Sequence, residues 1–317
     1  THKYSMRKAI ATKYPEICPK FINVESLSEL ALADLSEFQY PLIVKPNGLH
    51  SSYLVNKCHN QTELENVIKK IFKGINTVYK REYGTGKPGV TVEEFMSGDM
   101  YSVDVYVDND SNCYYLPLVR VVTSAEKGLD GYHSYSVMTP TDLGKKDVQD
   151  ANLCATKGID ALGLKNSTAH VEMFKTKSGW KIIEIGPRIG GHRQSLYWEA
   201  FGIDHYYNDL LIHMGEKPDL RHTKQKYALS FNMYADSEGE IVSIKGLDEA
   251  RLLEGVVYIK CYVAPGDKAI HASNGGQFLI DGVVAAHSRD HVEDALIKIR
   301  EKIKVEVRSG SASHRHY

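Results

Sequence analysis

Two glutamates in the stretch AHVEMFKTKSGWKIIEIGPRIGGHRQ have the type and spacing to act together chemically. Residues 169–174 and 180–186 alternate as two strands do, and residues 177–179 end in a glycine suited to positive φ in a hairpin turn. If the ladder is symmetric about the middle of that turn, Glu172 lies opposite Glu184. Like charges that face each other across a sheet destabilise it, so this pair requires a physical explanation.

Three explanations fit the facing carboxylates. A divalent cation could hold them together, because Mg²⁺ in proteins is usually bound by one or two carboxylates and by substrate phosphates. The two groups could instead share a proton, with the pKa of one carboxyl raised. The pair could also lie on an exposed strand face where water and salt screen the repulsion. The hairpin alone leaves these explanations open.

Alternation also assigns the two faces of the hairpin. His170 and Gly186 are predicted to lie on the face of the glutamates. The side chains predicted to point into the core are Val171, Met173, Ile183 and Ile185.

The residues after the second strand strengthen the functional interpretation. Arg188 supplies a fixed cation suited to a phosphate or an oxyanion. Gly190 and Gly191 allow the backbone to approach a ligand closely. An ordinary salt bridge is the alternative for Arg188, and its setting in EIGPRIGG favours a role in function.

Two earlier segments have the composition of a nucleotide site. VKPNGLHSS places Lys45 at the end of a strand, before a loop in which backbone N–H groups, Ser51 and Ser52 could face phosphate oxygens. The loop lacks the Walker A spacing, and a surface lysine before an ordinary turn is the alternative. VEEFMSG predicts a connector whose backbone and Glu93 bind an adenine edge, or else an ordinary edge strand.

The composition limits the class of protein. With 42% hydrophobic and 25% charged residues, the 317 residues suffice for two domains or one elaborated domain. A formal net charge of −1 gives no global field that favours nucleic acid or an anionic membrane. No apolar run approaches the roughly 18 residues of a membrane span. Five cysteines without a CxxC pair indicate reduced thiols in a cytoplasmic protein.

The elements that must position these residues fall into three predicted regions, 1–96, 97–215 and 216–317. Helices are predicted near 61–73, 147–162, 195–213 and 291–303, and strands at 40–46, 90–96, 101–108 and 113–122. The last region is predicted to be mostly strands. This mixture, without regular βαβ alternation, predicts the α+β class.

Together, the segments VKP…SS, VEEFMSGDMYSVDV, HVE and EIGPRIGG resemble the ATP-grasp superfamily in order and spacing. DGVVAAHSRDHVEDALIKI, in the last region, resembles the C-terminal region of L-amino-acid ligases of that superfamily. The resemblance implies two α+β lobes that clamp Mg-ATP, formed by 1–96 and 97–215, and a C-terminal mostly-β region. It also implies an ADP-forming carboxylate–amine ligase.

The resemblance assigns roles to residues at matching positions. Glu172 and Glu184 match the glutamates that bind Mg²⁺, or Mn²⁺ in its place, and Arg188 matches the catalytic arginine near the transferred phosphate. Mg²⁺ bound to the nucleotide would thus neutralise the facing glutamates. The residues implied to bind ATP are Lys3, Lys45, Ser51, Ser52, Glu93, Glu94, Phe95 and Met96.

The expected substrates are a small-molecule carboxylate, an amino acid among the candidates, and an amine. ATP would phosphorylate the carboxylate, and the amine would attack the acyl phosphate to give an amide, ADP and phosphate. His133, His192, Arg193 and Trp198 are the predicted substrate contacts, from their position alone. The alternative is an ATP-binding module or inactive homologue without turnover.

The sequence departs from the family pattern at three points. Many members read Glu-x-Asn where this chain ends its strand with Gly186, so either water replaces the amide ligand or a second metal binds more weakly. Many carry a ribose-binding glutamate where Met100 stands, beside Asp99. The domain that usually precedes this fold is expected either from a longer chain or from a partner subunit. A homodimer is the other expected assembly.

Overall fold

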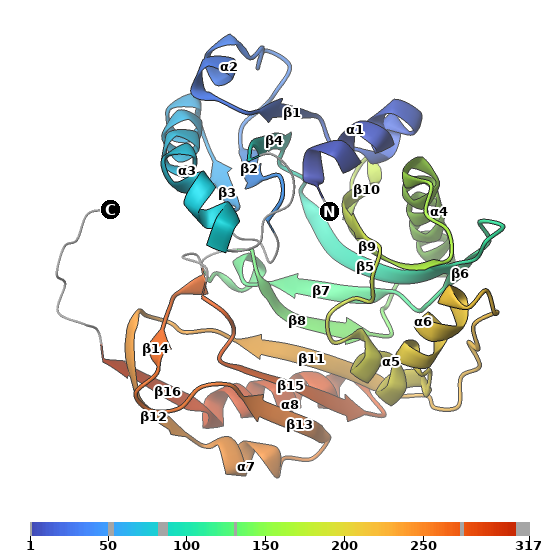
Figure 1. Ribbon diagram of the computed structural model, residues 1–317. Helices are drawn as coiled ribbons and strands as arrows, with labels where there is room; N and C mark the ends of the chain where they lie inside the picture. The colour runs from blue at the N-terminus through green and yellow to red at the C-terminus, as the bar shows by residue number, and fades with distance from the viewer. Residues whose placement is uncertain (1, 50–53, 82–87, 130–131, 273–275, 309–317) are drawn as a thin grey trace. The chain divides into compact units, whose positions relative to one another are not determined.

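A computed structural model describes residues 2–49, 54–81, 88–129, 132–272 and 276–308 (Figure 1). The chain forms two compact units that interleave along the sequence. Unit 1 comprises Thr1–Leu118, Asp142–Gly190 and Tyr206–Pro218, and unit 2 comprises Val119–Thr141, Gly191–His205 and Asp219–Tyr317. Helices combine with antiparallel sheets in each unit, which confirms the predicted α+β class. The division into three consecutive regions stays a prediction.

The first sheet of unit 1 has the strand order β1–β4–β2–β3, with α2 and α3 packed against it. Its elements are β1 (Phe21–Val24), α2 (Leu27–Leu32), β2 (Leu42–Pro46), β3 (Asn56–Cys58), α3 (Gln61–Arg81) and β4 (Val90–Glu94). Asn60 caps α3, since its side chain accepts from the N–H of Glu63 at 2.9 Å. Leu64, Ile68 and Ile71 are buried in the core beneath the helix, which extends beyond its predicted end at residue 73.

The second sheet of unit 1 carries the glutamate hairpin. Three of its strands lie side by side in the order β10–β9–β5, and β6 also pairs with β5. The elements are α1 (Lys3–Lys13), η1 (Pro15–Ile17), β5 (Gly98–Val107), β6 (Cys113–Tyr115), α4 (Lys145–Leu162), β9 (Ser167–Thr176), β10 (Gly179–Gly186) and α6 (His205–His213). Helices α1 and α4 pack on each other and on β10 (Figure 1). The single strand predicted at 113–122 is wrong, because the backbone leaves the ladder around Pro117, which lacks an N–H donor.

The hairpin confirms one part of the predicted register and corrects another. Glu172 and Glu184 are cross-strand partners, as predicted. The turn is one residue shorter than expected, because Gly179, with φ 105°, already pairs with Thr176. A β-bulge between Ile182 and Glu184 restores the register.

The bulge also corrects the predicted core of the hairpin. Ile182 is fully buried in the core with Ile185, whereas Ile183 is half-buried and lies outside that cluster. The extra residue in one strand shifts which side chains reach the core, so the prediction of Ile183 as a core residue is wrong.

Unit 2 contains the strand order β7–β8–β11–β15–β13 and a small sheet of order β14–β12–β16. Its strands are β7 (Val119–Thr123), β8 (Ser134–Thr139), β11 (Tyr227–Met233), β12 (Gly239–Lys245), β13 (Val256–Cys261), β14 (Lys268–Ala269), β15 (Ile280–Ala286) and β16 (Lys304–Arg308). Its helices are η2 (Ala125–Lys127), α5 (Arg193–Phe201), α7 (Leu247–Arg251) and α8 (Arg289–Lys302), and the last of these confirms a predicted helix.

The helix predicted near 195–213 is two helices. Gly202, at φ 74°, caps the end of α5 by donating its N–H to the carbonyl of Trp198, and α6 begins at His205. A left-handed glycine at this position ends a helix that the apolar periodicity alone would continue. Across the described parts of the chain, each helix lacks the length or the apolar character needed to cross a bilayer.

Candidate nucleotide and metal site

The facing glutamates lie on the side of the hairpin opposite its core. The side chains of Glu172 and Glu184 are 30% and 29% exposed, so solutes can reach both carboxylates. The ammonium group of Lys3 lies 4.0 Å from Oε2 of Glu184 and also donates to the carbonyl of Leu49. Lys3 is buried at the start of α1. A predicted phosphate-binding lysine and a predicted metal ligand are therefore neighbours in unit 1.

Two buried side chains, His170 and Asp104, form a hydrogen-bonded chain that ends at the carboxylate of Glu172. Nδ1 of His170 lies 2.5 Å from Oδ1 of Asp104, and Nε2 lies 3.3 Å from Oε1 of Glu172. The other oxygen of Asp104 accepts from the backbone N–H of Gly190 at 2.8 Å. Asp104 thus fixes both the imidazole ring and the loop that carries Arg188. Sequence reasoning missed Asp104, because its partner His170 becomes visible only once β5 and β9 are aligned.

Lys45 is held by a buried carboxylate. Its Nζ atom lies 2.7 Å from Oε2 of Glu93, and the guanidinium of Arg7 donates to both oxygens of Glu93 at 2.8 and 3.0 Å. Burial alone would raise the pKa of Glu93, but the charges of Arg7 and Lys45 lower it to about 2. Burial lowers the pKa of Lys45, although Glu93 opposes that shift. An ammonium group has three N–H donors, and the contact with Glu93 uses one of them.

The predicted adenine contact of Glu93 stays a prediction. In the structure, the carboxylate of Glu93 holds Lys45 and Arg7, and its backbone lies in β4, the strand between β1 and β2. The geometry thus supports Glu93 as a residue that positions Lys45.

The backbone after Lys45 is tied down by buried polar groups. Asn47 is buried and accepts from the hydroxyl of Thr91 at 2.5 Å and from the backbone N–H of Lys3 at 2.8 Å. The hydroxyl of Tyr79 accepts from the N–H of Gly48 at 2.8 Å. Ser51 and Ser52, predicted to lie over the phosphates, fall outside the described residues.

The predicted hinge segment borders a hollow of about 660 Å³ in unit 1. Glu94, Phe95 and Met96 line one part of it, and the turn of the glutamate hairpin lines another. The ammonium group of Lys57 lies 3.9 Å from the centre of the Phe95 ring. A volume of this size is typical of small-molecule sites.

Arg188 is exposed, and its guanidinium donates a hydrogen bond of 2.8 Å to the carbonyl of Ile189. A Cβ atom built on Gly186 would lie 3.4 Å from Cγ and Nε of Arg188. The arginine stem therefore occupies space beside Gly186, the position at which the resemblance implies an asparagine.

The donor set fits a hard divalent cation. In the described part of the chain, His, Cys, Asp and Glu side chains nowhere gather in a group of three or more that could hold a metal ion. Glu172 and Glu184 alone are a pair of carboxylates on facing strands, and Mg²⁺ in proteins commonly takes its remaining oxygen ligands from phosphates and water. Cross-strand carboxylates that solvent reaches meet this requirement.

The predicted substrate residues lie in unit 2. His133 packs on Tyr234 with ring centres 4.0 Å apart, and burial lowers its pKa. His192 precedes α5 with φ 60°, and its Nδ1 lies 3.8 Å from Oδ2 of Asp281. Burial lowers the pKa of His192, against the charge of Asp281. Arg193 is buried and donates to the carbonyl of Gly191 at 2.9 Å.

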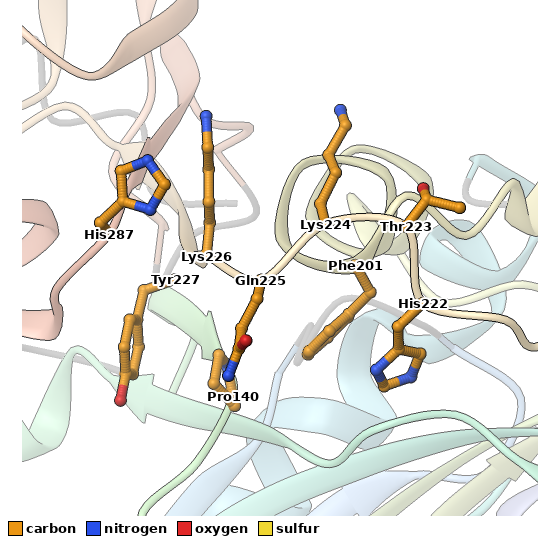
Figure 2. A pocket seen from close by; sticks show the side chains of 9 residues that line it. All are labelled: Pro140, Phe201, His222, Thr223, Lys224, Gln225, Lys226, Tyr227 and His287. Carbon is orange, nitrogen blue, oxygen red and sulfur yellow. The ribbon is translucent and has the colours of Figure 1, made fainter.

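Unit 2 also contains a hollow of about 770 Å³ (Figure 2). The described residues that line it include none of the predicted site residues. Lys224 and Lys226 point the same way from the segment before β11, and Gln225 points the other way, toward Pro140. Lys224 also stacks on Trp198, 4.8 Å from its ring centre.

Comparisons with known proteins identify two families that match parts of this chain. A family model described as ATP-grasp domain matches residues 38–195, and one described as L-amino acid ligase C-terminal domain 2 matches residues 233–308. A D-alanine–D-alanine ligase from Bacillus velezensis is 27% identical over 201 residues, which cover 60% of this chain and 51% of that protein. The chain spans about half the length of the curated relatives it matches.

Two solved structures have a similar fold. The L-amino acid ligase from Bacillus licheniformis superposes with a TM-score of 0.81 and 21% identity, over 97% of this chain and 73% of that chain. The N5-carboxyaminoimidazole synthase from Aspergillus clavatus, in complex with ADP and 5-aminoimidazole ribonucleotide, superposes with a TM-score of 0.70 and 15% identity, over 95% and 72%.

Proposed function

The chain belongs to the ATP-grasp superfamily, and from this premise we propose that it is an ATP-dependent, ADP-forming carboxylate–amine ligase. One observation carries the proposal. Glu172 and Glu184 face each other on the solvent-accessible side of a hairpin, and Lys3 lies beside them. Two carboxylates and a lysine in this arrangement suit a metal–nucleotide complex.

In phosphoryl transfer, the protein contributes mainly by positioning the reactants and by neutralising charge. Lys3 and Lys45 would offset the charge of the nucleotide phosphates. Glu93 and Arg7 hold Lys45 in a fixed direction, so little reorganisation is needed when the nucleotide binds. Glu94, Phe95 and Met96 would contact the adenine through the hollow that they line.

Glu172 and Glu184 would hold the divalent ion. When bound, Mg²⁺ neutralises charge on the phosphates and polarises them as a Lewis acid. His170 and Asp104 orient Glu172 from behind, as the supporting partners of a metal ligand do.

In the proposed reaction, a carboxylate oxygen of the substrate attacks the γ-phosphorus, and the bond to ADP breaks. The nitrogen of the amine then attacks the acyl carbon, the bond from that carbon to phosphate breaks, and the amine gives up a proton. Arg188 would stabilise the negative charge of the acyl phosphate and of the tetrahedral intermediate. We propose an amino acid as one substrate, which the match of residues 233–308 to an L-amino acid ligase domain supports.

A screen for phosphate release tests this function. Pairs of amino acids, or of other small carboxylates and amines, are offered with Mg-ATP to the complete protein. Phosphate release that depends on the carboxylate is the expected result. Hydroxylamine should trap the activated carboxylate as a hydroxamate even when the natural amine is unknown.

A nucleotide-binding module without turnover is the second candidate, which Gly186 and Met100 favour because family ligands are missing there. It predicts ATP binding with neither phosphate release nor hydroxamate for any pair. That outcome would contradict the ligase proposal.

The Glu184→Gln variant tests the metal role within the ligase proposal. It keeps the size of the side chain and removes its charge, so Mg²⁺-dependent turnover should fall about a hundredfold or more. The melting temperature should stay close to that of the wild type, and Glu65→Gln, a change to a surface residue paired with Lys69, should leave turnover intact. Unchanged turnover in Glu184→Gln would remove this residue from the mechanism.

A further inference from the structure

Arg7 is completely buried, lies one turn after Lys3 on α1, and binds two strands at once. Its guanidinium donates to both oxygens of Glu93 on β4. It also donates to the carbonyls of Ile182 at 2.6 Å and of Ile183 at 2.9 Å, on β10. One side chain therefore links the strand that holds Lys45 to the strand that carries Glu184.

The two carbonyls belong to the β-bulge that precedes Glu184. In a regular strand, successive carbonyls point in opposite directions, whereas here the carbonyls of Ile182 and Ile183 both reach Arg7. Strand β10 lies at the end of its sheet, where backbone groups need partners from outside the ladder. Met6, the neighbour of Arg7, supplies a further hydrogen-bond partner to this strand, because its Sδ accepts from the N–H of Ile185 at 3.2 Å.

We propose that Arg7 is a positioning residue for the metal site. It fixes the bulge that aims Glu184 toward Glu172, and through Glu93 it fixes the direction of Lys45. This inference rests on the proposed function, because it takes Glu184 as a ligand of the divalent ion. Supporting partners of this kind typically change metal affinity by about ten- to a hundredfold.

Only an arginine can make this set of contacts. The guanidinium is a planar fork with five N–H donors. It donates four hydrogen bonds here, two to the carboxylate of Glu93 and one to each carbonyl of Ile182 and Ile183. A lysine would keep a positive charge for Glu93 but is a single point donor on a flexible stem. Arg7→Lys therefore separates the charge of Arg7 from its hold on the bulge.

Hydrogen exchange tests the hold on the bulge without any ligand. In Arg7→Lys, the amides of β10 from Ile182 to Gly186 should exchange at least about tenfold faster than in the wild type, with β5 unchanged. Lys8→Gln is the matched control, because Lys8 is the next residue on α1 and is exposed. Equal exchange of β10 in the wild type and Arg7→Lys would overturn the inference.

Binding of Mn²⁺ with a non-hydrolysable ATP analogue, followed by electron paramagnetic resonance, tests the metal role. The dissociation constant for Mn²⁺ should rise about tenfold or more in Arg7→Lys and stay unchanged in Lys8→Gln. Wild-type affinity in a folded Arg7→Lys variant would overturn the inference alone. A wild-type protein that binds no Mn²⁺ with the analogue would overturn the proposed function as well. An Arg7→Lys variant that circular dichroism shows to be unfolded would assign Arg7 to the fold and reject the inference.

Discussion

At the scale of single residues, Glu93 concentrates the electrostatics of the candidate site. Its side chain is 2% exposed and contacts Arg7 and Lys45. Burial by itself would raise the pKa of this carboxyl, but the two cations lower it from 4.5 to about 2. Because the pKa is lower in the folded state than in the unfolded chain, Glu93 stabilises the fold above about pH 4.5. This stabilisation is lost as the pH falls from about 4.5 toward 2.

The Glu93→Gln variant should therefore lose stability in a pH-dependent way. At pH 7 the free energy of unfolding should fall by about 3 kcal/mol or more, because two buried cations lose their carboxylate. Near pH 3 the deficit should be smaller, since Glu93 is protonated in the unfolded wild-type chain at that pH and its stabilisation of the fold is already partly lost. Urea denaturation at the two pH values measures the difference, and Glu37→Gln, a change to an exposed carboxylate, is the control. An equal deficit at both pH values would contradict the assigned pKa.

Residue types predicted part of this site from the sequence alone. Glu172 and Glu184 lie within one hairpin, and the predicted pairing is correct because the bulge offsets a turn that is one residue shorter than predicted. Arg7 and Asp104 escaped prediction because their partners are far away in the sequence, 86 residues for Arg7 and Glu93 and 66 for Asp104 and His170, and a buried arginine has no local signature. Long-range contacts of this kind become visible only when the strands are aligned.

At the scale of elements, the bulge in β10 decides which isoleucine stabilises the core. Ile182 is fully buried, and its Cδ1 atom lies against Gly158 of α4, where a Cβ would come within 2.3 Å. Ile183 is half-buried next to Glu184. Periodicity predicted the hairpin and both strands, but it could not predict an inserted residue, because the bulge depends on partners from α1.

Alanine substitutions test this assignment of the two isoleucines. Ile182→Ala should lower the free energy of unfolding by about 2–5 kcal/mol, as the loss of a core side chain does. Ile183→Ala removes the same atoms from a half-exposed position and should cost about 1 kcal/mol or less. Chemical denaturation of the two variants measures both values. A larger cost for Ile183→Ala than for Ile182→Ala would support the regular register that alternation predicts and would contradict the bulge.

At the scale of the whole molecule, the mixture of strand and helix signals predicted the fold class but little of how the chain is assembled. The α+β class followed from the mixture of strand and helix signals, and the matching family models agree with it. The interleaving of the two units was invisible in the sequence, because each unit joins segments from distant parts of the chain. With a net charge of −1, the chain has no global field, so the proposed nucleotide binding would depend on local groups such as Lys3 and Lys45.

The most direct test of the account is anomalous diffraction from a crystal of the protein with Mn²⁺ and a non-hydrolysable ATP analogue. The account predicts an Mn²⁺ ion bonded to carboxylate oxygens of both Glu172 and Glu184 and to phosphate oxygens of the analogue. An analogue bound elsewhere, or an ordered analogue with no Mn²⁺ between the two glutamates, would contradict it.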